Sequence, residues 1–195
     1  VQTMLPVRSF KDIGEDESVV LCTRNGVVKK TALSAYANPR RGGIIAVGLT
    51  EGDELIAAER CDADSSVLIA SRSGKAILFG ESDIRAMGRT AVGVRGIALG
   101  NDDAVVGMKV VAPGTTILTL TANGYGKRTR LEDYRLQRRG GQGIINIKAT
   151  PRNGPVVGVA QVVDEDQLMR ITNGGKVLRC AATGISVMGR NTQGV

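Results

Sequence analysis

The chain has 195 residues, which is enough for one sizeable domain or for several small units that share a core. Hydrophobic residues make up 42% and charged residues 23%, a balance that excludes a disordered chain. The formal charge is +7 and the isoelectric point is near 9.7, values that indicate either a polyanionic partner or a merely soluble basic surface.

Several classes of protein are excluded by what the composition lacks. The chain contains no His, so catalysis that uses histidine as base or nucleophile cannot occur here. Cys22, Cys61 and Cys180 are odd in number and far apart, which predicts neither a disulfide framework nor a zinc site and favours a reducing cytoplasm. No apolar run approaches the roughly 18 residues of a membrane helix. There is no P-loop pattern, so we expect no bound ATP or other cofactor in this chain. The acidic turns lack the full spacing of a calcium loop, so we expect no metal site.

Four hairpins recur along the chain. Each begins with an apolar strand that ends in a turn of the Asn-Gly type, in which both central residues favour positive φ, and a return strand follows. The turn glycines are separated by 48, 50 and 51 residues. The outgoing strands are 19–24, 67–72, 117–122 and 168–172, the turn glycines are Gly26, Gly74, Gly124 and Gly175, and the return strands are 27–31, 75–79, 126–129 and 176–180.

A second glycine motif follows each hairpin with the same period of about 50 residues. The four copies lie at 40–44, 88–94, 137–144 and 189–195. An acidic or polar turn and another apolar strand come next, as in 51–57 and 101–106. Each repeat therefore predicts about four short strands, and only the stretch near 131–134 could form a helical turn.

This periodicity predicts an all-β fold built like a propeller from four-stranded blades. We expect a single domain, 1–195, of about four repeats that form a complete or a partial ring. The approximate repeats are 1–60, 61–110, 111–162 and 163–195. WD repeats need Trp and His, and the chain has neither.

Charge is segregated in the same way in every repeat. The segments from the return strand through the glycine motif hold 18 of the 26 Lys and Arg residues but only four acids. Because repeats stack in a fixed relation, these segments should align into a positive stripe suited to a phosphate backbone. The alternative is a set of solvated strands with scattered counter-charges. The predicted DNA-binding residues are Lys29, Lys30, Arg40, Arg41, Arg89, Lys127, Arg128, Arg130, Arg138, Arg139, Lys176, Arg179 and Arg190.

Aromatic side chains are scarce in and beside the basic segments, where only Tyr36, Phe79, Tyr125 and Tyr134 occur. Binders of single strands usually stack bases on aromatic rings, so the scarcity favours duplex DNA held through its phosphates. The glycines would let the backbone approach a phosphate while neighbouring arginines grip its oxygens. Alternatively, the glycines only shape the connections between strands.

The third glycine motif resembles the gyrase box, the heptapeptide that marks the C-terminal domain of DNA gyrase A subunits. Its residues are Gln137, Arg138, Arg139, Gly140, Gly141, Gln142 and Gly143, with Gln142 where the family has a basic residue. The resemblance covers the whole chain. It implies a β-pinwheel, a propeller-like ring in which each blade lends a strand to its neighbour.

The resemblance also implies that double-stranded DNA wraps around the basic edge and supports ATP-dependent negative supercoiling by the full enzyme. The chain alone is then not an enzyme, and ATP and Mg are expected elsewhere in the holoenzyme. The implied partners are the rest of the gyrase A polypeptide and the gyrase B polypeptide in a cytoplasmic A2B2 assembly, with no membrane.

Two departures from the family pattern leave alternatives open. The box belongs to the first blade in the family, but at least two repeats precede Gln137, so we interpret 137–143 as a box-like copy in a later blade. The family has five or six blades and this chain about four, which predicts a partial ring or a fragment. The alternatives are the equivalent C-terminal domain of topoisomerase IV and a protein-interaction propeller that binds an acidic partner.

Overall fold

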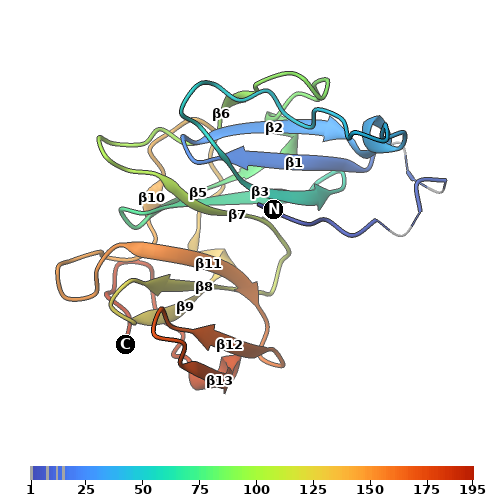
Figure 1. The fold of residues 1–195 in the computed structure, drawn as a ribbon. Helices are drawn as coiled ribbons and strands as arrows, with labels where there is room; N and C mark the ends of the chain where they lie inside the picture. Colours follow the sequence, from blue (N-terminus) through green and yellow to red (C-terminus); the bar gives the residue numbers. More distant parts are fainter. Residues whose placement is uncertain (1, 8, 12, 15) are drawn as a thin grey trace.

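The computed structural model describes residues 2–7, 9–11, 13–14 and 16–195, and it confirms the all-β prediction (Figure 1). No helix among these residues is both long and apolar enough to span a membrane. The strands are β1 (Ser18–Thr23), β2 (Val27–Ala32), β3 (Leu55–Cys61), β4 (Ser66–Ser71), β5 (Lys75–Gly80), β6 (Val94–Arg95), β7 (Val105–Val111), β8 (Thr116–Thr121), β9 (Gly126–Arg130), β10 (Ile144–Ile145), β11 (Val156–Val162), β12 (Gln167–Ile171) and β13 (Val177–Ala181).

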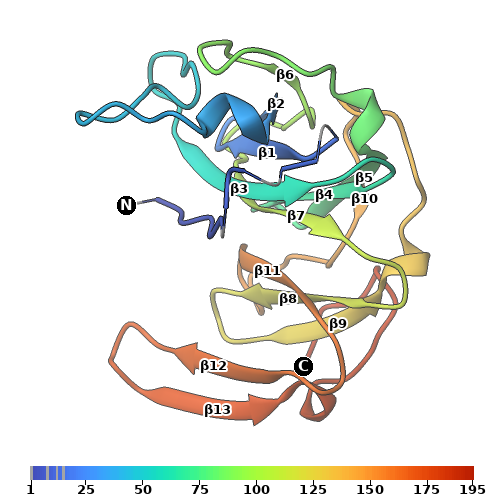
Figure 2. The ribbon, with the colours of Figure 1, turned by 90° about the vertical axis from the view of Figure 1, so that its right-hand side faces the viewer.

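The strands form four antiparallel sheets, which we call blades 1 to 4. Their strand orders are β3-β1-β2-β6, β10-β5-β4-β7, β11-β8-β9 and β12-β13. The blades follow one another along an arc that the described residues do not close, as Figure 2 shows. This arrangement agrees with the predicted propeller-like architecture and with a partial ring.

Blades 1, 2 and 3 each receive an outermost backbone partner from the repeat that follows. The strand β6 belongs by sequence to the second hairpin but pairs with β2 of blade 1, and β10 likewise pairs with β5 of blade 2. Blade 3 gains the same kind of partner from the last residue, because Gly126 and Val195 exchange two backbone hydrogen bonds of 2.9 and 3.0 Å. This exchange of strands is what defines a pinwheel.

The last glycine of the second, third and fourth motifs is required by this exchange. Gly93 and Gly143 have φ of +117° and +71°, and a Cβ on either would lie closer than 3.0 Å to a carbonyl oxygen of the preceding return strand. Those oxygens belong to Val28 and Ala76. The glycines therefore let one repeat lie directly against the hydrogen-bonding edge of another, in agreement with the alternative that they shape the connections between strands.

The core lies between neighbouring blades rather than inside one. The inner strands β3, β7 and β11 lie side by side, and the apolar cluster between blades 1 and 2 contains buried residues of both sheets. Val20 and Val28 of blade 1 pack there with Ile69 and Ile77 of blade 2. Because the apolar area is buried by stacking, each blade depends on its neighbour for most of its stability.

The hairpin turns lie at the predicted residues, but their geometry is different. Each turn glycine has positive φ, whereas Asn25 and Asn123 are not among the residues with positive φ, so the expectation of two positive-φ residues is wrong. Gly26 N–H donates to Thr23 O at 3.0 Å, which closes a three-residue loop with glycine in the left-handed position.

Short 3₁₀ turns follow every return strand, although the sequence predicts one only near 131–134. They are η1 (Leu33–Tyr36), η2 (Glu81–Asp83), η3 (Leu131–Asp133) and η4 (Ala182–Gly184). The turns η2, η3 and η4 lead the chain to the outer side of the preceding blade, where the residues that follow them bridge to Lys30, Leu78 and Arg128.

Replacing Gly143 with Ala tests the exchange geometry. We expect the free energy of unfolding to fall by roughly 2–4 kcal/mol, because a Cβ would meet Ala76 O in addition to the strain of positive φ. Gly43→Ala is a matched control, since Gly43 ends the first motif with φ +85° and a Cβ there meets nothing within 4 Å. Urea denaturation of both variants measures the difference, and equal losses would contradict the steric argument.

Candidate nucleic-acid interface

The exchanged strands and the glycine motifs together form the outer edge of the arc. Exposed cations occur on this edge or on the loops that lead to it in every repeat. Of the predicted residues, six are exposed: Arg40, Arg41, Arg130, Arg138, Lys176 and Arg179. Arg40 and Arg41 lie in the long loop between η1 and β3, which projects from the body in Figure 2.

One arginine of each later motif binds a backbone carbonyl of the preceding repeat instead of extending freely into solvent. Arg89 donates from Nη1 to Ile45 O at 2.7 Å, Arg139 to Arg95 O at 3.0 Å, and Arg190 to Ile145 O at 2.8 Å. The acceptors are 44 or 45 residues upstream in each case. These three arginines, half-buried, therefore join neighbouring blades and keep only part of the guanidinium for a phosphate.

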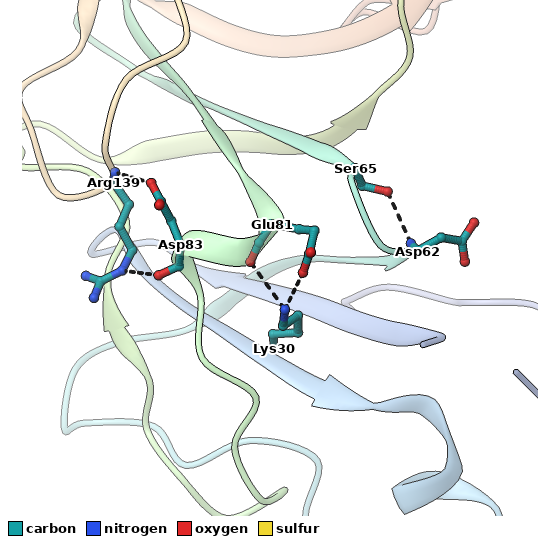
Figure 3. Close-up of polar contacts among 6 residues, drawn as sticks. All are labelled: Lys30, Asp62, Ser65, Glu81, Asp83 and Arg139. Carbon is teal, nitrogen blue, oxygen red and sulfur yellow. Dashed lines mark hydrogen bonds and ion pairs between the residues drawn. The ribbon is translucent and has the colours of Figure 1, made fainter. Parts of the chain in front are cut away.

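Arg139 and Arg190 make a second contact of the same kind. Arg139 Nε donates to Asp83 O at 2.8 Å, and Arg190 Nε donates to Asp133 O at 2.6 Å. The Arg139 backbone N–H also donates to the Asp83 carboxylate at 3.3 Å. Figure 3 shows the Arg139 side chain and backbone reaching Asp83.

Lys29, Lys127 and Arg128 are predicted to face DNA, but the structure buries all three. The residues are 1%, 0% and 4% exposed. Lys29 and Lys127 donate to backbone carbonyls of the next motif, and Arg128 binds Ile185 O at 3.0 Å and Asp164 at 2.5 Å. They point into the contact between repeats. The prediction that these side chains contact phosphate is therefore corrected, and their role is to hold the repeats together.

Lys30 also differs from its prediction. Its ammonium group forms an ion pair with Glu81 and donates to Glu81 O at 3.3 Å, with both side chains mostly buried (Figure 3). Of the four acids in the basic segments, Glu81 is thus paired with a cation inside the fold, whereas the Asp83 carboxylate accepts the backbone N–H of Arg139.

The box-like motif lies against the return strand β5 of blade 2 and the end of the exchanged strand β6 of blade 1. Gln137 N–H donates to Leu78 O at 2.8 Å, and Gly140 N–H donates to Gly96 O at 2.6 Å. Gly140 and Gly143 have positive φ, and Gly141 and Gln142 are exposed. The motif is therefore held by its backbone, while Arg138 extends to solvent.

The predicted set omits three arginines that are exposed on or beside the same edge. They are Arg85, Arg95 and Arg135. Arg95 lies in the exchanged strand β6, and the other two follow η2 and η3 at equivalent positions. The repeat alignment contains this signal, since Arg85 and Arg135 are separated by one period. Phe79 and Tyr134 are buried and unable to stack on bases.

The buried lysine of blade 3 has a perturbed acid–base equilibrium. Burial lowers the pKa of Lys127 from 10.5 to about 8, with a smaller lowering by the charge of Arg190 and an opposing effect of Asp133. Burial and the charge of Arg89 lower the pKa of Lys29 in the same direction. Both ammonium groups are held by carbonyl dipoles rather than by a carboxylate.

We compared the chain with known protein families and solved structures. The sequence profile of the family described as DNA gyrase C-terminal domain, beta-propeller, matches residues 17–62, 65–112, 115–162 and 166–195. A solved C-terminal domain of DNA topoisomerase IV superposes with a TM-score of 0.90 at 23% identity, covering 98% of this chain and 59% of that one. A solved DNA gyrase A C-terminal domain gives 0.84 at 27% identity, covering 95% and 62%.

The chain therefore belongs to the family of DNA gyrase C-terminal domains. Among its relatives are the DNA gyrase A protein of Salmonella typhimurium, 49% identical over the whole chain, and that of Escherichia coli, 45% identical over the whole chain. The chain spans 22% of the length of each of these proteins.

The buried lysine makes stability depend on pH in a defined direction. Because the pKa of Lys127 is about 8 in the folded state and 10.5 in its usual state, the unfolded chain binds more protons between these values. The free energy of unfolding of the wild type should therefore rise relative to Lys127→Met as pH increases from 8 to 10.5. Urea titrations at several pH values measure this, with Lys176→Met, at an exposed lysine, as control. A relative fall with pH would contradict the assignment.

Proposed function

We propose that this chain binds duplex DNA along its outer edge and bends it, as the DNA-wrapping part of a gyrase A polypeptide. The observation that carries the proposal is the recurrence of exposed arginine on or beside this edge from blade to blade, including Arg85, Arg135 and Arg138. The named relatives, the DNA gyrase A proteins of two bacteria, support the same interpretation.

Bending DNA around the domain requires repeated contacts between the protein and the phosphate backbone. Duplex DNA has a persistence length of about 150 base pairs, so bending a short segment around a small body costs several kcal/mol. Cations spaced one per blade offset that cost by neutralising phosphates at intervals. The described residues contain no long helix to enter a major groove, so recognition through the backbone, with little sequence preference, is favoured.

The function of the whole assembly is part of the same proposal. The chain would present wrapped DNA to a catalytic core elsewhere in the gyrase A polypeptide and to the gyrase B polypeptide, in an A2B2 enzyme that uses ATP and Mg to introduce negative supercoils. A bacterial cytoplasm is the compartment in which such an enzyme would act. This chain would supply binding and geometry, and the chemistry would lie in the remaining length of the polypeptide.

A topology assay tests wrapping directly. Relaxed circular DNA is incubated with the protein, closed with ligase and analysed on a gel after the protein is removed. We expect a shift in linking number that grows with protein concentration. In parallel, log K plotted against log salt should have a slope of roughly −5 to −9 for duplexes of unrelated sequence. No shift and a slope near zero would favour a partner other than DNA.

Adjacent arginines of the box-like motif should separate binding from stability. Arg138→Ala should weaken duplex binding several-fold with an unchanged melting temperature, because Arg138 is exposed. Arg139→Ala should weaken binding and also lower the melting temperature, because its hydrogen bonds to Asp83 and Arg95 join two blades. Fluorescence anisotropy and differential scanning calorimetry measure the two effects. The reverse pattern would contradict the division of roles.

A further inference from the structure

A polar trio alternates with an apolar one from blade to blade. The trio occupies three positions, two in the return strand and one at or just after the 3₁₀ turn, with spacings of two and five residues. Blades 1 and 3 have Lys, Thr and Tyr at these positions, whereas blades 2 and 4 have apolar residues or Cys. The trios are Lys29, Thr31 and Tyr36; Ile77, Phe79 and Ile84; Lys127, Thr129 and Tyr134; and Leu178, Cys180 and Ile185.

The lysine of each polar trio holds the glycine motif of the next repeat. Lys127 Nζ donates to Gly189 O at 2.7 Å and to Arg190 O at 2.8 Å. Lys29 Nζ does the same with Gly88 O and Arg89 O. In both cases the buried ammonium group fixes the Gly-Arg peptide, whose arginine then reaches across to the preceding repeat.

In blade 1 the tyrosine of the polar trio extends the same contact, whereas in blade 3 it bonds to a different group. In blade 1 the hydroxyl of Tyr36 donates to Ala46 O at 3.1 Å, and Lys29 Nζ donates to the same oxygen at 2.9 Å. In blade 3 the hydroxyl of Tyr134 bonds to the side chain of Asn146, which lies two repeats after Ala46. Two donors on one acceptor, as in blade 1, make the contact more rigid than a single bond would.

We call the contact between a return strand and the glycine motif of the next repeat a seam, and the buried lysine that bonds to that motif a clamp. The seam between blades 2 and 3 is built without a clamp. Ile77 occupies the lysine position, and its methyl group faces Gly141 of the box-like motif. Arg139 is the cation that joins this motif to the preceding repeat. The seams on either side each combine an arginine with a buried lysine.

We propose that Lys29 and Lys127 are positioning residues that lock two of the three seams, and that the seam carrying the box-like motif is the compliant one. Its relevance to DNA rests on the proposed function: a locked seam holds its arginine at a fixed place on the outer edge, and a compliant seam lets the edge adjust to bound DNA. The alternation assigns different mechanical roles to repeats that share one backbone.

Hydrogen exchange in the unmodified protein tests the clamp without DNA, because equivalent amides serve as internal controls. Gly48 N–H and Met87 N–H cross the first seam, bonding to Ala91 O and Lys30 O, and Ala98 N–H and Gln137 N–H cross the second in the same way. We expect the amides of the second seam to exchange at least about tenfold faster. Equal protection, or slower exchange in the second seam, would overturn the proposal.

Lys29→Met tests causation, with Ile77→Met as the matched control. Lys29→Met should accelerate exchange of Gly48 and Met87 while leaving Ala98 and Gln137 unchanged, whereas Ile77→Met should change neither seam by more than about twofold. Loss of general stability would accelerate all four amides together and would overturn a local role. If Lys29→Met does not fold, the comparison within the unmodified protein decides.

Hydrogen exchange measured with added duplex DNA distinguishes failure of this inference from failure of the proposed function. If both hold, adding a duplex should slow exchange of Ala98 and Gln137 by a larger factor than that of Gly48 and Met87. Unequal seams that DNA does not affect would leave the clamp standing and count against the proposed function. Unequal seams that DNA protects by the same factor would overturn the role of the compliant seam in DNA binding.

Discussion

The structure depends on pairing the backbone groups along the outer edge of each return strand. Each return strand presents backbone donors and acceptors on its outer side, and these groups remain unpaired until the following repeat supplies a strand. In blades 1 and 2 that strand is only two residues long, β6 or β10. The glycine before it allows the close approach of the two strands. The glycine motif therefore has a structural role, which is to complete one blade with a strand from the next repeat.

Several of the basic residues form hydrogen bonds that stabilise the same strand exchange, and these donors are not free for a ligand. A backbone carbonyl and a phosphate oxygen are both acceptors for the N–H groups of Lys and Arg. Lys29 and Lys127 are buried against carbonyls, and Arg89, Arg139 and Arg190 use part of their donors in the same way. The net charge therefore overstates the number of cations available to DNA, and the residues that remain at the surface carry the proposed interface.

The repeat, the hairpins and the all-β architecture are predictable from the sequence because turn chemistry and strand alternation act within a few residues. Spacing alone does not reveal whether a strand pairs within its own repeat or with the previous one. The burial of Lys29 and Lys127 escapes prediction for a similar reason, since a lysine on a strand is normally exposed. Alignment of the repeats holds the signal, because Ile77 and Leu178 occupy the same position.

The segregation of charge also follows from the fold. Asp53 and Asp103 lie in the acidic turns, and each accepts a hydrogen bond from the backbone of the hairpin turn beside it, at 3.0 Å from Asn25 N–H and 2.9 Å from Ser73 N–H. Such carboxylates stabilise turns at the ends of strands. The acids are thus placed at the ends of the blades by local structure, while arginines that join repeats gather on the outer edge. A positive edge able to accept a phosphate backbone arises from these two structural demands together.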